Sequence, residues 1–287
     1  MKSRIVLNIV LVLGLLALVL FSYLRPKNSE TRPTIKLSQA TRESVERVKI
    51  ERQASPAIQL VRQATGWQIT APLQTQADTH QVDRVTDIVT MTATGKLPGT
   101  DRAQFGLDPA TVKVYLNDEE FSFGRINEIT NEQYLGHGEA VYLVPPFYGY
   151  GIPASVNILI SRKLLDETEQ PVRFDFGAYR IGRNEKGAWS VEGKAPATLA
   201  TPPSQDNLNR WADEWRQTSA LSAEPAAGAQ AADQSLTVHF ANGKSAALKI
   251  KRTGTELQVY RTDRRLVYRV GTETGQRLLD PGRVAEK

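Results

Sequence analysis

The residue types that most often transfer protons or bind metal ions are few and widely spaced in this sequence. Its 287 residues include three histidines, His80, His137 and His239, and no cysteine. The lack of cysteine excludes disulfide bonds, thiolate metal sites and cysteine nucleophiles. No histidine pair has the short helical spacing of a His-Glu-x-x-His metal site. The sequence therefore predicts no catalytic residue, no metal ligand and no cofactor, and we expect surface or half-buried histidines.

One short segment has part of the composition of a phosphate-binding loop. Residues 187–194 read Gly-Ala-Trp-Ser-Val-Glu-Gly-Lys. A phosphate loop needs four residues between its glycines and a Ser or Thr after its lysine. Here five residues intervene and Ala195 follows, so we expect no nucleotide site. Trp189 and Val191 fit a strand instead.

Charge argues against a nucleic-acid partner. The formal net charge is +5, but four of the 36 basic residues lie in residues 1–27, which carry no acid. The other 32 bases nearly balance the 31 acids, so the body lacks the basic surface that nucleic-acid binding needs. Arg261, Arg264, Arg265 and Arg269 form a local basic cluster. They could contact lipid headgroups or an acidic partner, but ordinary surface is the favoured interpretation.

The best candidate for recognition is an aromatic segment rich in proline and glycine. Residues 145–153 hold Phe147, Tyr148 and Tyr150 among three prolines and two glycines. Prolines restrict a loop, and aromatic rings give a large contact area for each immobilised side chain. These three residues are therefore the predicted partner-binding residues. The alternative is that the rings cover the core or the seam between two halves of the body, and burial distinguishes the two.

The N-terminus has the composition of a membrane anchor. Residues 5–24 carry no charge, and a helix of that length spans roughly 30 Å, the thickness of a bilayer core. No small-residue cleavage site follows it, which favours an uncleaved span over a signal peptide. We expect a cytoplasmic tail at residues 1–4, a transmembrane helix at 5–24 and a polar linker at 25–43. Long C-terminal domains cross largely regardless of charge, so the predicted location is the inner (cytoplasmic) membrane, single-pass, with the body in the periplasm or outside.

The body contains an internal repeat. Trp67 and Trp189 each begin a strand-like segment, and a helical apolar pattern follows, at 79–93 and at 204–218. Period-two strands, a turn and further strands come next in both halves. We therefore expect an α+β fold with two repeated subdomains, 44–168 and 169–287, each an antiparallel sheet with one main helix.

Smaller features complete this expectation. Asp78 and Ser204 are the predicted N-caps of the two helices. Asn242-Gly243 predicts a two-residue hairpin turn. The alanine-rich residues 222–233 predict a flexible surface loop. The repeats are expected to close on similar phrases, 162–166 and 276–280.

The ordered landmarks resemble one protein family. They are Trp67-Gln68-Ile69, a helix containing Asp83-Arg84-Val85, then Phe105-Gly106-Leu107-Asp108-Pro109, and finally Val141-Tyr142-Leu143-Val144. This order is similar to that of the extracytoplasmic domain of unknown function 4340. The resemblance covers about 44–170 well and the second repeat more loosely, since that repeat lacks the Phe-Gly-Leu-Asp-Pro phrase. It implies a single-span or exported protein related to domains that accompany ABC-type export systems, including gliding-motility transporter auxiliary proteins. It implies no catalytic residue.

Three functions are compatible with these features. The first is a membrane-anchored, non-enzymatic accessory protein that binds another envelope or transporter protein, such as an ABC-type complex. The second is a cell-envelope enzyme, for example a hydrolase. The third is a structural spacer. An enzyme should gather polar residues of perturbed pKa in a concave site, whereas a binding module should expose an apolar patch.

Overall fold

The computed structural model describes residues 11–21, 34–196, 199, 203–228 and 231–283. The chain divides into two compact units, 1–35 and 36–287. In the first unit residues 11–21 are helical. Among the residues described, no helix is both long and apolar enough to cross a membrane. The other residues of the predicted span, the predicted tail 1–4 and residues 25–33 of the predicted linker lie outside the described residues.

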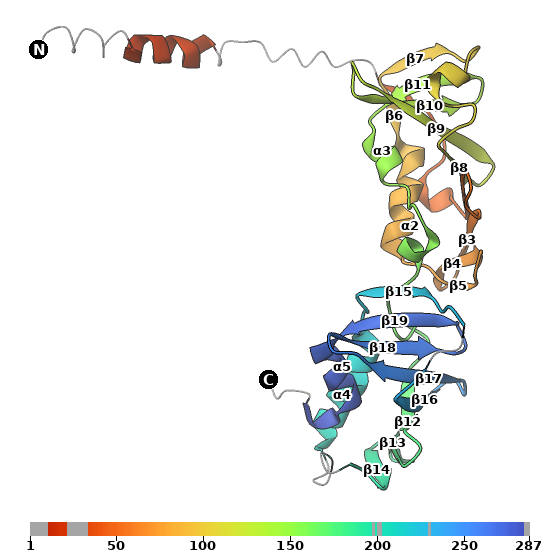
Figure 1. Cartoon of the computed structure of the whole chain (residues 1–287), viewed down its shortest axis with the longest axis vertical. Coiled ribbons are helices and arrows are strands. Elements are labelled where there is room, and N and C mark those ends of the chain that lie inside the picture. Colours follow the sequence, from red (N-terminus) through yellow and green to blue (C-terminus); the bar gives the residue numbers. More distant parts are fainter. Residues whose placement is uncertain (1–10, 22–33, 197–198, 200–202, 229–230, 284–287) are drawn as a thin grey trace, which may run out of the picture. The chain divides into compact units, whose positions relative to one another are not determined.

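The unit 36–287 contains two large antiparallel sheets and few helices, so the predicted α+β class is confirmed (Figure 1). The first sheet has nine strands in the order β5-β4-β3-β2-β8-β9-β10-β11-β7. Their bounds are β2 (Arg47–Arg52), β3 (Ile58–Gln63), β4 (Gly66–Ala71), β5 (Thr75–Gln76), β7 (Gly95–Pro98), β8 (Val112–Leu116), β9 (Glu119–Asn127), β10 (Glu132–His137) and β11 (Ala140–Val144).

The second sheet has eight strands in the order β14-β13-β12-β16-β17-β18-β19-β15. Their bounds are β12 (Pro171–Asp175), β13 (Tyr179–Arg183), β14 (Trp189–Gly193), β15 (Ser222–Pro225), β16 (Gln234–Phe240), β17 (Ser245–Arg252), β18 (Glu256–Arg261) and β19 (Leu266–Gly271). The short strands β1 (Ile35–Lys36) and β6 (Thr92–Ala93) lie outside both large sheets.

The two sheets repeat one strand order. Each begins with a three-stranded meander, β2-β3-β4 or β12-β13-β14, whose first strand pairs with a second meander, β8 to β11 or β16 to β19. Each ends on an edge strand that comes before the second meander in the sequence, β7 or β15. The first sheet adds β5 at its other edge. The order, direction and connections of the strands therefore correspond in the two sheets. That the two halves are repeats of one unit, with a boundary at 168/169, stays a prediction.

A helix follows the first meander in each half. These are α2 (Thr79–Thr86), which continues as a 3-10 turn at Asp87–Thr90, and α4 (Gln205–Gln217). The predicted caps are confirmed: the Asp78 carboxylate accepts from the backbone N–H of two first-turn residues, and the Ser204 hydroxyl accepts from one. Such caps satisfy N–H groups that have no partner within the helix.

Both helices bury their predicted apolar side chains. Val82, Val85, Leu208, Trp211 and Trp215 are all buried in one continuous core. The indole N–H groups of Trp211 and Trp215 both donate to the carbonyl of Leu278, at 2.9 and 3.0 Å. These bonds satisfy the polar atoms that burial of a tryptophan would otherwise leave unpaired.

The two strand tryptophans occupy corresponding places. Trp67 pairs across the sheet with Arg62 in the first half, and Trp189 pairs with Arg183 in the second. Each arginine lies over the indole of its partner, with its guanidinium carbon 4.8 Å and 5.1 Å from the ring centre, respectively. Each pair therefore covers one face of a buried tryptophan with a cation at the same strand position.

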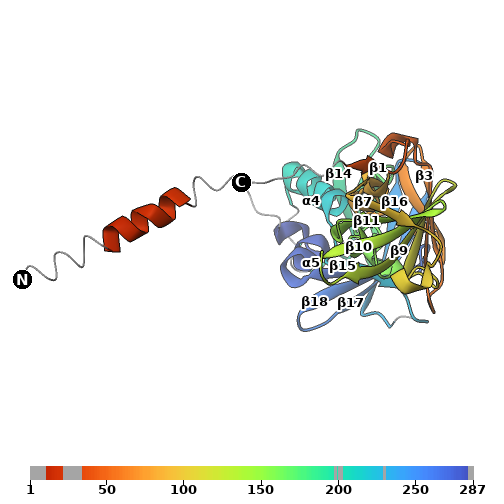
Figure 2. The same cartoon turned by 90° about the horizontal axis from the view of Figure 1, so that it is seen from above.

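Further helical segments follow each second meander. They are the single turn α3 (Phe147–Tyr150) in the first half and α5 (Thr272–Leu279) in the second, and α4 and α5 lie side by side against the second sheet (Figures 1 and 2). The shorter 3-10 turns are Arg42–Ser44, Ala103–Phe105, Val156–Leu159 and Pro281–Arg283. The expectation of one main helix for each repeat therefore omitted α5.

Three local expectations were wrong. The phrase 276–280 lies mostly in α5, whereas 162–166 is not helical, so the two phrases are not structurally equivalent. The hairpin between β16 and β17 has a three-residue loop, because Phe240 pairs with Lys244 and only Gly243 has a positive φ, of 80°. Ser222–Pro225 is not a flexible loop but edge strand β15, paired with β19.

The predicted linker also overlaps the folded unit, which includes residues from Lys36 onward. Ser38 is buried, and its hydroxyl donates to the Glu119 carboxylate at 2.6 Å. This contact fixes the start of the folded unit to the β8–β9 hairpin before the predicted repeat begins at residue 44.

Candidate functional site

The predicted aromatic residues form a single helical turn, α3, directly after β11. Phe147 and Tyr150 are exposed by 61% and 74%, three positions apart in this turn. Tyr148 is partly buried and packs against the core. Burial raises the pKa of the Tyr148 hydroxyl, and the nearby Asp87 carboxylate adds to the rise. The structure thus separates the predicted set into one anchoring ring and two presented rings.

Contacts from the first sheet hold this turn in place. The Arg52 guanidinium donates to the carbonyl of Ile152 at 2.9 Å and also contacts the carbonyl of Pro153. Gly149 lies so close to the Gln133 side chain that an added Cβ would stand 2.8 Å from the Gln133 Cδ. The turn therefore presents Phe147 and Tyr150 from a fixed backbone, which lowers the entropy lost when they bind.

Other exposed apolar side chains were missed by the sequence reasoning. Ile129, Ile158 and Leu221 are large, apolar and exposed. Ile129 lies at the turn between β9 and β10, and Leu221 directly precedes β15. The neighbours of Ile129 and Leu221 in the sequence are polar or small, so no local pattern marked them, whereas Ile158 lies in an apolar run that predicts burial.

The histidines do not come together. The His137 ring stacks on Phe121 at 4.7 Å and lies 3.2 Å from the Glu119 carboxylate. The His239 ring contacts the Arg173 guanidinium, and burial together with that cation lowers the pKa of His239. His80 lies in the first turn of α2. Within the part of the chain that the structure describes, no group of His, Cys, Asp and Glu is arranged to hold a metal ion.

Residues 187–194 form no phosphate loop. Gly187 lies in a turn with φ of 77°, and the following Trp189–Gly193 is strand β14. The backbone N–H groups there pair with β13 rather than converge on one point, as a phosphate-binding loop requires. The interpretation of this segment as a strand is confirmed.

Two of the four arginines of the predicted basic cluster, Arg261 and Arg264, form an internal ion network, whereas Arg265 is exposed. Arg261 is only 1% exposed, and its guanidinium donates to Glu169 at 2.7 and 2.9 Å and to Asp263 at 2.6 Å. Arg264 bonds Asp166 and Glu169. Burial acts to raise the pKa of Glu169, but the bonds and charge of Arg261 outweigh it and hold that pKa below its usual range. For Asp166 burial prevails, and its pKa is raised.

This network fixes the segment that joins the two sheets. Asp166 and Glu169 lie in that segment, whereas Arg261 ends β18 and Arg264 lies in the turn before β19. The sequence reasoning missed the network because Asp166 and Glu169 lie more than 90 positions from the arginines that they bond, and no local pattern joins them.

Two pockets accompany these features. A polar pocket of about 710 Å³ borders the joining segment, and its lining includes Asp78, His80, Ser161, Arg162 and Lys163. Asp78 caps α2 there and lies 4.0 Å from the Arg162 guanidinium. The Asp78 side chain at this pocket therefore caps α2 and contacts the segment that joins the two sheets.

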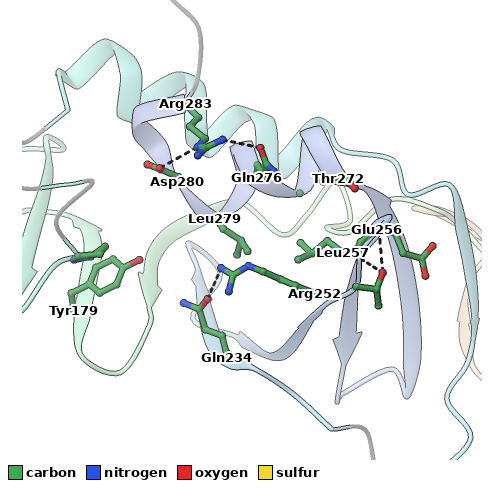
Figure 3. Close-up of a pocket in the computed structure, with 14 residues that line it drawn as sticks. Tyr179, Gln234, Arg252, Glu256, Leu257, Thr272, Gln276, Leu279, Asp280 and Arg283 are labelled. Atoms are coloured by element: carbon green, nitrogen blue, oxygen red, sulfur yellow. Dashed lines mark hydrogen bonds and ion pairs between the residues drawn. The ribbon is translucent and has the colours of Figure 1, made fainter.

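A second pocket of about 620 Å³ lies beside α5 on the second sheet (Figure 3). Leu257 and Leu279 supply apolar side chains, and Tyr179 and Arg252 point into it from different strands. An added Cβ on Gly275 would stand 2.7 Å from the Leu257 Cβ. This close approach of α5 to β18 forms one wall. Nothing in the sequence marked the pocket, because its residues come from four separate strands, from α5 and from the loops next to them.

Residues 67–209 match the model of a family described as a domain of unknown function (DUF4340). The matched region runs from β4 to α4 and contains every landmark on which the sequence resemblance rests. That resemblance is confirmed. No curated protein and no solved structure matches the chain.

Proposed function

Because the chain belongs to the family of domain of unknown function 4340, we propose that it is a membrane-anchored accessory protein whose body binds another protein. The observation that carries this proposal is the α3 turn, which exposes Phe147 and Tyr150 while Tyr148 is anchored in the core. Aromatic side chains on a fixed backbone are typical of the few residues that dominate protein–protein affinity.

The membrane anchor in this proposal is the uncharged run 5–24. Its length suits a bilayer, and residues 11–21 within it are helical. The body would lie in the periplasm or outside. The partner is an envelope protein, and the family resemblance favours a component of an ABC-type transport complex.

A comparison of captured proteins tests the binding surface. The full chain is purified from its own membranes in mild detergent, as wild type, as Phe147→Ser with Tyr150→Ser, and as Ile129→Ser. Loss of two aromatic contacts, each worth about 1–2 kcal/mol, should weaken capture of a specific protein at least about tenfold. Thermal stability should change by less than about 0.5 kcal/mol, since both rings are exposed.

Ile129→Ser is the matched control. It also replaces an exposed apolar side chain, one that is 95% exposed in a turn of the same sheet. It should capture the same protein as the wild type. Equal capture by the double variant, or equal loss in both variants, would contradict the assignment of α3 as the docking surface and favour a structural spacer.

A further inference from the structure

Two arginines line the pocket beside α5, and among the residues that the structure describes only one of them, Arg283, forms an ion pair. The Glu256 carboxylate bonds Arg269, at 2.6 Å, and the Asp280 carboxylate pairs with Arg283, at 3.6 Å. The Arg252 side chain donates to the amide oxygen of Gln234 at 3.4 Å and forms no ion pair within residues 34–196, 203–228 and 231–283.

The direction of Arg252 follows from its place in β17. Leu248 and Ile250 are buried on the face of this strand that meets the core, and Arg252 lies on the same face but is exposed, one step beyond the buried row. Lys251 lies on the opposite face. Arg252 therefore extends from the end of the buried row, and its guanidinium lies in the pocket near Gln234 and Leu279 (Figure 3). The Asp233 carboxylate accepts from the backbone N–H of Arg252 at 2.7 Å.

Tyr179 faces Arg252 from β13. Its ring stacks on Phe176 at 4.6 Å, which fixes its orientation. Burial raises the pKa of the Tyr179 hydroxyl, the Asp280 carboxylate adds to the rise, and Arg252 opposes it. The hydroxyl is therefore protonated at neutral pH and can donate a hydrogen bond into the pocket.

We propose that this pocket binds a small amphipathic anion. Its carboxylate or phosphate group contacts the Arg252 guanidinium and the Tyr179 hydroxyl, and its apolar portion lies on Leu257 and Leu279. The volume of about 620 Å³ falls within the roughly 300–1,000 Å³ typical of small-molecule sites, which combine an apolar lining with a few polar groups. This site is in the second half of the body, apart from α3, and so adds to the proposed protein-binding function.

Calorimetric titration of the full chain in a non-ionic detergent tests the site. The probes are hexanoate, hexyl phosphate, hexanol and hexyltrimethylammonium. Hexanoate or hexyl phosphate should bind the wild type. The probe with the higher affinity identifies the preferred head group, carboxylate or phosphate. Arg252→Gln should weaken that binding at least about tenfold, because a charge-assisted contact is lost. Leu279→Ala should weaken it less, through the apolar portion alone.

Lys251→Gln is the matched control, since it removes the same charge from the opposite face of β17 and should leave binding unchanged. Circular dichroism checks that the variants are folded. Equal binding of hexanol and hexanoate would overturn the proposal, as would unchanged binding by Arg252→Gln. Failure of both anions to bind the wild type at millimolar concentration would also overturn it.

Discussion

Arg261 shows how a single residue can differ from what its local sequence indicates. Four arginines within nine positions are typical of a surface patch, yet this side chain is buried between two carboxylates. A buried guanidinium is tolerated only when carboxylates and carbonyls satisfy its donors. The Glu169 carboxylate and the Leu164 carbonyl, both in the segment joining the sheets, accept hydrogen bonds from the Arg261 guanidinium.

We therefore expect Glu169→Gln to destabilise the folded unit by about 3 kcal/mol, since it leaves a buried cation short of its partner. The folded-state pKa of Glu169 is lowered, so its ionisation favours folding. That stability is present above its ordinary pKa of about 4.3 and is lost as the pH falls through the lower folded-state value. Asp166 has a raised pKa and contributes with the opposite sign.

Denaturant unfolding of both proteins at neutral and acid pH measures this prediction. The difference in unfolding free energy between wild type and Glu169→Gln should shrink as the pH falls below about 4. Lys163→Gln, which breaks an exposed pair with Glu167, is the control and should change stability by less than about 1 kcal/mol. A difference that does not vary with pH would show that Glu169 acts through packing rather than charge.

At the scale of elements, α3 depends on one glycine. Gly149 lies against Gln133, whose buried amide donates to the Gly124 carbonyl at 3.0 Å. Gly149→Ala should shift the turn or Gln133 and cost about 1–3 kcal/mol. It should also reduce partner capture, because Phe147 and Tyr150 move with the turn.

Thermal unfolding and the capture assay measure this effect together. Gly271→Ala is the matched control, because Gly271 has a φ of −58° and no atom within 4 Å of an added Cβ. It should change stability by no more than about 0.5 kcal/mol. If Gly149→Ala behaved like Gly271→Ala, the turn would not depend on this close contact.

The sequence predicts elements well where the signal is local. Asp78 and Ser204 mark helix starts because a cap acts within three residues, and buried residues at helical spacing mark α2 and α4. The sequence fails to predict an element where a partner distant in the chain determines its structure. Ser222–Pro225 becomes a strand because β19 offers a free edge, where Ala223 is buried and Glu224 bonds Arg269. The pocket beside α5 also depends on strands distant in sequence.

At the scale of the whole molecule, the two sheets share an order but differ in what they add. The shared strands and helices build the cores. The first half adds the aromatic turn α3, and the second adds α5 and its pocket. Such additions tolerate change more readily than the shared strands, because changes there leave the packed core intact. The proposed docking surface lies on such an addition, α3, whereas the proposed anion site combines the added helix α5 with the shared strands β13, β17 and β18.

The anchor proposed for residues 5–24 determines on which side of the membrane both sites lie. Lys2 and Arg4 precede the apolar run, but more basic residues follow it, so charge alone does not set the orientation. A four-residue tail is easily kept inside, and a long C-terminal body crosses largely regardless of its charge. Alkaline phosphatase fused after Lys287 should therefore be active, whereas β-galactosidase fused at the same position should be inactive. Removal of residues 1–24 is the control and should reverse both activities. An active β-galactosidase fusion on the full chain would place the body in the cytoplasm and rule out an extracytoplasmic partner for the exposed rings of α3.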